Sequence, residues 1–411
     1  MSFSNPAIRL LPPGTSGDAT RLLATRGIRA FGDGLASLLL PVYLGLIGYD
    51  AIEIGLLATA SLLGSAALVW LSGLVAHRLG VRRLLLMATL LPVVTGAGFA
   101  TQTEFWPLLA IAVVGTLTPT AGDVSLFLPL EQAMLAGATA PRHRTALFAR
   151  YSIMGSVMVA VGSLAIGLPD LLSRHAAIEL ALALQLMFVL YALLGLACAL
   201  LYAGLRRPDP AAATGAPRAL GPSRGIVHRL TALFAIDAFG SGFFVQSLFA
   251  LWLLERFELQ PAAVGAIFFW TGLASAASFL AASALSARIG LINTMVFTHI
   301  PANLCLIALP FAPTLEIALV LMVVRALLSQ MDVPTRTSYV MAVVTPEERP
   351  AAAAFTAIPR SLATAIAPAL SGWMLALSGF GWPLVIGGAI KIAYDLGLLA
   401  MFRKVKPPEE R

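Results

Sequence analysis

The strongest constraint on how this 411-residue chain folds is its succession of long apolar segments with few charges inside them. Charged residues form only 11% of the chain, whereas soluble domains contain about 25%. A helix needs about 20 apolar residues to cross the roughly 30 Å of hydrocarbon in a bilayer. The sequence therefore predicts an all-α membrane protein with twelve transmembrane helices, at residues 24–48, 52–76, 82–103, 106–128, 145–168, 177–204, 229–254, 261–286, 291–312, 314–335, 351–377 and 382–402.

The basic residues indicate how these helices are oriented. Of the 27 lysines and arginines, 23 lie in or beside alternate connections, two lie on the other side, and Arg325 and Lys391 lie within helices. Because cytoplasmic connections collect basic residues, we expect both termini on the cytoplasmic side of the cytoplasmic membrane. The positive charge is thus assigned to membrane orientation and lipid headgroups. Nucleic-acid binding is excluded because no basic patch is interleaved with stacking aromatic residues.

Composition also divides the chain into two halves. Residues 206–228 are the longest polar stretch inside it and are rich in proline and glycine, so they are interpreted as a cytoplasmic loop. The halves are then residues 1–205 and 229–411, with six predicted helices each.

A weak internal repeat supports this division. An offset of 204 residues aligns Asp33 with Asp237, and an offset of 205 aligns Glu131 with Arg336. Small changes of offset are what short insertions in loops produce, and duplicated halves are a common plan for transporters. We therefore expect two pseudo-symmetric six-helix halves.

Several ionisable side chains lie inside the predicted spans, where each costs at least about 2.5–3.5 kcal/mol at the bilayer centre. They fall in the first, fourth, seventh and tenth helices, and they are expected to face a protein interior or a wet cavity. The candidates for substrate binding or proton coupling are Asp33, Asp237, Arg325, Asp123, Asp332 and Arg29. Burial penalises the charged form of an aspartate and a nearby arginine favours it, so such acids are candidates for proton exchange.

Structural roles are the alternative for some of these residues. Arg29 and Asp33 lie four residues apart, so an ion pair that only fills space is an alternative to coupling. Asp123 and Asp332 lie nearer the cytoplasmic side, where gate pairs and coupling sites are both consistent with the pattern.

Other polar residues in the spans are interpreted as structural or gating groups. Glu131 and Arg336 are expected to form interfacial gate or loop contacts. Lys391 and Asp395 also lie four residues apart, and we expect them to neutralise each other. In the ninth helix, His299 and Asn303 share a face and are expected to make polar packing contacts.

The loop after the second helix carries a family resemblance. The segment GLVAHRLGVRR resembles the signature loop of the major facilitator superfamily, in which glycine, three residues, aspartate and arginine precede a second glycine and two basic residues. The matching residues are Gly73, Arg78, Gly80, Arg82 and Arg83, whereas His77 stands where the family usually has aspartate. The resemblance implies a gating role for this loop. It also implies a central cavity lined by helices 1, 4, 7 and 10, and a monomer that functions alone.

The sequence favours transport over catalysis. It contains no GxxxxGK[ST] loop for ATP and no cluster of catalytic or metal-ligating side chains, so no enzyme activity, cofactor or metal is expected. The prediction is a secondary active transporter that exports a small molecule against a proton flux. Export is suggested by stretches such as FLPLEQAMLAGATAPRHR, which resemble those of efflux-type permeases. The alternatives are an uptake permease and a non-transporting membrane receptor.

Overall fold

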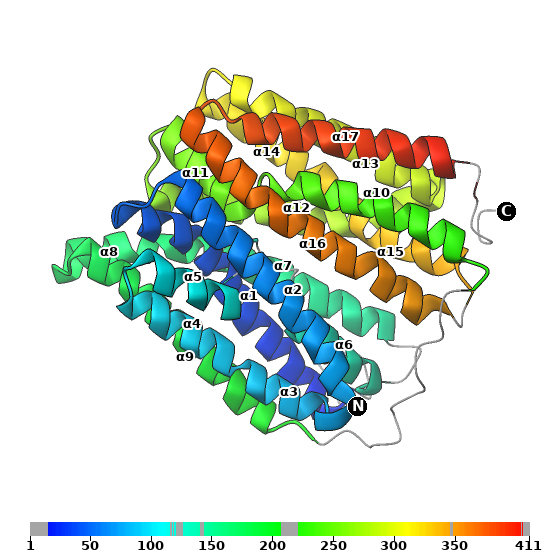
Figure 1. Ribbon diagram of the computed structural model, residues 1–411, viewed down its shortest axis with the longest axis horizontal. Helices are drawn as coiled ribbons and strands as arrows, with labels where there is room; N and C mark the ends of the chain where they lie inside the picture. Colours follow the sequence, from blue (N-terminus) through cyan, green and yellow to red (C-terminus); the bar gives the residue numbers. More distant parts are fainter. Residues whose placement is uncertain are drawn as a thin grey trace, which may run out of the picture.

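The computed structural model describes residues 15–115, 117, 119–120, 126–139, 144–206, 221–345, 348–403 and 405. Within these residues the secondary structure is entirely helical, and the long helices lie side by side in one bundle (Figure 1). The first half contains α1 (Gly17–Leu46), α2 (Ala51–Leu79), α3 (Val81–Ala88), α4 (Leu90–Thr101), α5 (Phe105–Val114), α6 (Phe127–Gly137), α7 (Arg144–Leu164), η2 (Ala165–Gly167), α8 (Leu168–Ala176) and α9 (Leu180–Ala203).

The second half follows the same plan. It contains α10 (Arg224–Gly242), α11 (Gln246–Arg256), α12 (Pro261–Ile289), α13 (Leu291–Ala308), η4 (Leu309–Phe311), α14 (Leu315–Ser329), α15 (Asp332–Val343), α16 (Arg349–Leu377) and α17 (Trp382–Phe402). Nine helical stretches of the described chain are long and apolar enough to cross a membrane. The other three predicted spans coincide with α1, α16 and the α5 region, so the all-α membrane fold is confirmed.

Two predicted helices are interrupted. The fourth, predicted over 106–128, ends as α5 at Val114, where Gly115 takes an extended conformation, and helix resumes with α6. The tenth, predicted over 314–335, breaks at residues 330–331 between α14 and α15. Phe127 and Asp332, at which α6 and α15 begin, are related by the same offset of 205 residues as Glu131 and Arg336. The interruption is therefore a shared feature of the two halves.

Hydrophobic packing differs between the two ends of the bundle. At the end where α1 begins and α17 ends, each half has its own core: one includes Leu22 and Tyr202, and the other includes Leu230 and Phe402. At the opposite end, one core contains residues of both halves, such as Phe188 of α9. We call these the separated end and the joined end. The halves are thus held together mainly at the joined end.

The contact between α2 and α16 shows how closely the halves approach there. A Cβ atom on Gly55 would lie 2.6 Å from the carbonyl oxygen of Pro368, so only a glycine fits this crossing without displacement. One turn further along α2, the hydroxyl of Thr59 accepts a 2.9 Å hydrogen bond from the Ala369 N–H. The two helices therefore touch through backbone as well as side chains.

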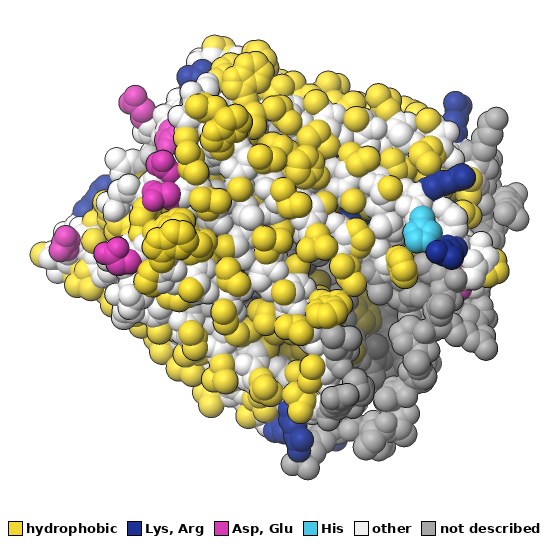
Figure 2. All heavy atoms as spheres, viewed as in Figure 1, with side chains coloured by type: hydrophobic (Ala, Val, Ile, Leu, Met, Phe, Trp, Pro, Cys, Tyr) yellow, Lys and Arg dark blue, Asp and Glu magenta, His cyan; other side chains and the backbone are white. Residues whose placement is uncertain are grey.

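The surface is consistent with a membrane environment. Figure 2 shows hydrophobic side chains over the middle of the visible face, acidic side chains toward one end, and basic side chains with a histidine toward the other. Large apolar residues such as Leu200 and Trp106 are 78% and 75% exposed, as expected for a lipid-facing surface. Exposed acids such as Glu104 and Glu179 lie in connections at the joined end.

Candidate functional site

In the first half, a buried acid gathers donors from three other helices. Glu131 of α6 is fully buried and accepts hydrogen bonds from the Thr25 hydroxyl at 2.7 Å and the Tyr202 hydroxyl at 2.5 Å. The Tyr151 hydroxyl and the Arg29 guanidinium also donate to its carboxylate. We call these five residues the Glu131 cluster. Because a buried carboxylate is tolerated only when it is paired and hydrogen-bonded, the cluster ties α1, α7 and α9 to α6.

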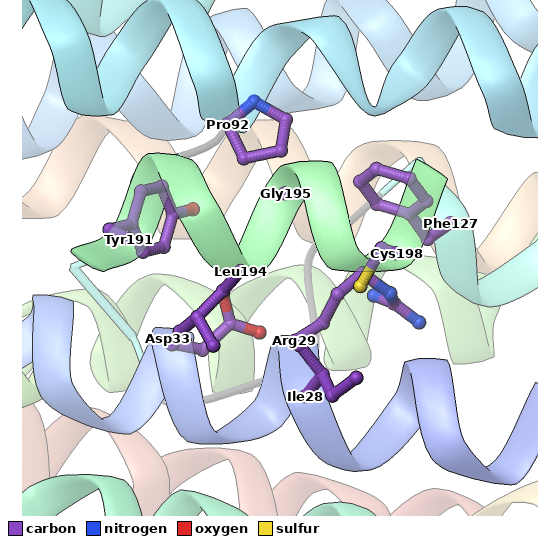
Figure 3. A pocket seen from close by; sticks show the side chains of 10 residues that line it. Ile28, Arg29, Asp33, Pro92, Phe127, Tyr191, Leu194, Gly195 and Cys198 are labelled. Carbon is purple, nitrogen blue, oxygen red and sulfur yellow. The ribbon is translucent and has the colours of Figure 1, made fainter. Parts of the chain in front are cut away.

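Arg29 and Asp33 also border a small cavity inside the first half. They lie one turn apart on α1 and point toward α9, where Cys198 and Leu194 face them (Figure 3). The guanidinium carbon of Arg29 additionally lies 4.5 Å from the ring centroid of Phe127. The cavity has a volume of about 30 Å³, which is room for one or two water molecules and far less than a solute requires. This cavity is therefore not itself a site for a substrate.

In the second half, an acid is held between two bases. Asp237 of α10 accepts from Nζ of Lys391 at 2.6 Å through Oδ1 and from Nη1 of Arg336 at 3.1 Å through Oδ2. Lys391 also donates to the Ser241 hydroxyl at 2.7 Å, and Asp332 Oδ2 lies 3.3 Å from Arg336 Nη1. We call these five residues the Asp237 cluster. It joins α10, α15 and α17 inside the second half.

The Asp237 cluster corrects one prediction from the sequence. Lys391 does not neutralise Asp395 on its own helix, because its ammonium group turns to Asp237 and Ser241 instead. Asp395, which is fully buried, lies 2.9 Å from Nδ1 of His299 and accepts a 3.4 Å hydrogen bond from the amide of Asn303. These contacts join α13 to α17.

The two clusters are related by the pseudo-symmetry, with acid and base exchanged. In the first half the base is on α1 and the acid on α6, as Arg29 and Glu131. In the second half the acid is on α10 and the base on α15, as Asp237 and Arg336. The sequence offset aligns the acid Glu131 with the base Arg336. The structure places each of them in a buried ion pair within its own half.

Arg325 lies apart from both clusters. Its guanidinium carbon is 4.9 Å from the ring centroid of Phe244, which lies between α10 and α11. Its Nε atom is buried and has no hydrogen-bond partner among the described residues. Arg325 is therefore held by an aromatic face rather than by an acid.

The signature loop is described in part. Gly80 has a φ of +77°, which suits a glycine, and joins α2 to α3. Arg82 donates to the carbonyl oxygen of Ala203 at 2.6 Å, whereas Arg83 is exposed. The side chains of His77 and Arg78, the surroundings of Gly73 and all of Asp123 lie outside the described part of the chain.

Sequence reasoning missed the hydroxyl donors of the Glu131 cluster and the role of Lys391. Tyr151 and Tyr202 are at most 1% exposed, but tyrosine is common in spans, and nothing in the sequence links these two to Glu131. Lys391 did carry a signal, because a lysine inside an apolar span needs a buried partner. The partner could not be identified because it lies 154 residues away on another helix.

Comparisons with known proteins agree with this architecture. A family profile described as Major Facilitator Superfamily matches residues 22–329 and 230–411. An uncharacterized membrane protein of Saccharomyces cerevisiae (strain ATCC 204508 / S288c), YJR124C, is 24% identical in an alignment of 424 residues that covers 94% of this chain and 94% of its own.

Three solved structures share the fold. The nucleoside transporter NupG has a TM-score of 0.71 at 15% identity over 94% of this chain and 100% of its own. The human organic anion transporter MFSD10 has a TM-score of 0.65 at 18% identity, with 94% and 100% covered. A bacterial homolog of the human lysosomal transporter Spinster, inward-facing and unoccupied, has a TM-score of 0.70 at 15% identity, with 95% and 99% covered. The chain belongs to the major facilitator superfamily.

Proposed function

We propose that this protein is a secondary active transporter that moves a small solute across the cytoplasmic membrane by alternating access, driven by protons. The observation that carries the proposal is the pair of buried charge clusters, one in each half, built on equivalent helices. Both include a helix that begins where a span is interrupted, and interrupted spans in transporters surround substrate and ion sites. A receptor without transport activity has no need for such clusters.

The packing supports alternating access. A single core at the joined end and two separate cores at the separated end allow the halves to rock about the joined end. With the orientation expected from the basic residues, the separated end is cytoplasmic and this state is inward-facing. The likeness to the inward-facing Spinster homolog agrees with this interpretation.

The Asp237 cluster supplies a means of proton coupling. A proton on Asp237 cancels its attraction for Lys391 and Arg336, which lie 2.6 and 3.1 Å away. Two buried cations then lose their shared counter-charge, so the protonated cluster favours a different arrangement of α10, α15 and α17. A proton that binds one arrangement more tightly shifts the balance between the two states. Asp33 and Glu131 are the corresponding candidates in the first half.

Export is the proposed direction, on the resemblance of FLPLEQAMLAGATAPRHR to efflux-type permeases. The structural neighbours include a nucleoside transporter and an organic anion transporter. Both solute classes therefore belong in a first panel of candidate substrates, beside amino acids, sugars and cationic drugs.

The test is proton movement in proteoliposomes that contain the purified protein and a pH-sensitive dye. Each panel member is added on one side, and solute flux is recorded in parallel. We expect one class to move protons in the opposite direction, and we expect Asp237→Asn to abolish this movement. The control is Glu179→Gln, which removes an exposed acid at the joined end.

Three outcomes decide between the alternatives. Protons and solute moving together indicate uptake rather than export. Solute flux without proton movement, or coupled flux unchanged in Asp237→Asn, contradicts the coupling role of the cluster. Solute binding without flux in a correctly folded preparation supports a receptor instead.

A further inference from the structure

Arg325 and Arg360, which lie half-buried within helices of the second half, have no acidic partner among the described residues. Neither Arg325 of α14 nor Arg360 of α16 forms an ion pair with any described residue, and the Nε atom of each is buried without a hydrogen-bond partner. Both side chains are half-buried rather than fully enclosed. Arginine remains charged at any physiological pH, so neither group escapes the cost of burial by losing its proton.

The acids that could have paired with them are already engaged. Asp237 is shared by Lys391 and Arg336, and Asp332 also bonds Arg336. Asp395 is engaged by His299 and Asn303 of α13. The charges of the described second half therefore leave positive charge in excess around this region.

Two cations of the second half face one aromatic ring. The Phe244 ring has the guanidinium of Arg325 at 4.9 Å and the ammonium of Lys391 at 5.9 Å from its centroid. Arg360 interacts instead with the charges of Arg336 and Asp237. Phe244 lies in the short break between α10 and α11, and α16 packs against both α10 and α2 of the other half. The region is therefore next to the contact between the two halves.

Resting on the proposed transport function, we propose that the transported solute is a small organic anion whose carboxylate or phosphate group binds Arg325. A guanidinium inside a membrane span is costly without a counter-charge, and a bound anion supplies that charge. Planar guanidinium groups also match the oxygens of carboxylate and phosphate with two parallel hydrogen bonds. The same region repels a cationic solute, because the acidic side chains around the region are already neutralised.

The experiment measures binding to the purified full-length protein, without any need for flux or protons. The probes are benzoate and phenyl phosphate, with benzyl alcohol and benzylamine as neutral and cationic counterparts of similar shape. Each Kd is obtained from the rise in the melting temperature of the protein with probe concentration. We expect at least one of the two anions to bind and both counterparts to fail. We expect Arg325→Gln to weaken anion binding by about tenfold or more, the usual loss for one charge-assisted pair, and Arg360→Gln to have a smaller effect.

Two further variants keep the test decisive. Arg325→Lys preserves the charge but not the two-pronged geometry, so it should fold and bind the anion with intermediate affinity. Arg174→Gln removes an exposed arginine at the joined end and should bind like the unmodified protein. Preference for phenyl phosphate over benzoate, or the reverse, identifies which anionic group the site recognises.

The proposal is overturned if neither anion binds, if benzylamine or benzyl alcohol binds instead, or if the anion's Kd is unchanged in Arg325→Gln. Failure of the coupling proposal has a different signature. Arginine-dependent anion binding without any proton movement in proteoliposomes keeps the anion site and removes proton coupling. Proton movement driven by a cationic drug keeps proton coupling and removes the anion site.

Discussion

The two buried clusters predict unequal costs for removing one cation from each. Arg29→Met leaves Glu131 without its only ion-pair partner among the described residues, whereas Lys391→Met leaves Asp237 with Arg336 at 3.1 Å. Breaking a buried pair by removing one partner typically costs about 3–5 kcal/mol. Losing one hydrogen bond to a charged group that keeps another partner costs about 1.5–3 kcal/mol. We therefore expect Arg29→Met to be the more destabilising variant by about 1–3 kcal/mol.

The assay is unfolding of the purified protein by a denaturing detergent in mixed micelles, followed by tryptophan fluorescence. Each variant is compared with the unmodified protein, and the double variant Glu131→Gln with Arg29→Met completes a cycle. Because removing both charges leaves no buried ion behind, the double variant should be destabilised by less than the sum of the two single variants. The Thr25 and Tyr202 hydroxyls, which share one carboxylate oxygen of Glu131, can still donate to the glutamine oxygen, and the glutamine NH2 group can donate to the Tyr151 hydroxyl oxygen.

Equal losses for Arg29→Met and Lys391→Met would refute this reasoning, because they would mean that the second cation near Asp237 contributes nothing. Additive losses in the cycle would refute the pairing of Arg29 with Glu131. A loss below about 1 kcal/mol for Arg29→Met would also contradict this reasoning, because an unpaired buried charge on Glu131 would then carry almost no cost.

Three further predictions concern the contacts outside the clusters. Gly55→Ala should destabilise the protein by about 1–3 kcal/mol in the same unfolding assay, since the new Cβ would lie 2.6 Å from the Pro368 oxygen. Asp50→Ala should cost about 0.5–2 kcal/mol there, since it removes the side-chain acceptor for the 2.9 Å hydrogen bond that begins α2. Hydrogen bonds from the Ser223 side chain and the Gly221 N–H lower the pKa of Glu348, so its stabilising effect should be complete above the ordinary glutamate pKa and disappear as the pH falls through the lowered value. The melting temperatures of the unmodified protein and Glu348→Gln, measured between pH 7 and pH 3, should therefore converge in acid.

The sequence correctly predicted the features that depend on residues close together along the chain. Apolar runs located the spans, because each helix must satisfy its backbone hydrogen bonds internally in lipid and must be about 20 residues long. The capping pattern at Asp50 and Glu53 is also local, and the reciprocal hydrogen bonds of 3.0 and 2.9 Å confirm it. The polar face of His299 and Asn303 likewise packs as expected, against Asp395.

The interruptions of the fourth and tenth spans were missed because polar residues near them, such as Asp123 and Asp332, were interpreted as the polar faces of continuous helices. In the tenth span, Gln330 and Met331 separate α14 from α15 although neither residue is a helix breaker. A backbone turn at this depth is tolerated only where neighbouring protein covers it, and the packing of other helices decides that.

Sequence alone determined that this protein is a helical membrane protein of two related halves, because hydrophobic length, charge bias and internal repeats are all properties of segments along the chain. It also indicated that the charges of the first, fourth, seventh and tenth helices matter. Only the tertiary structure decided which charge meets which. Lys391 reaches Asp237 rather than Asp395, and Arg325 meets an aromatic ring, because the partner of a buried charge is chosen by helix packing across long sequence separations.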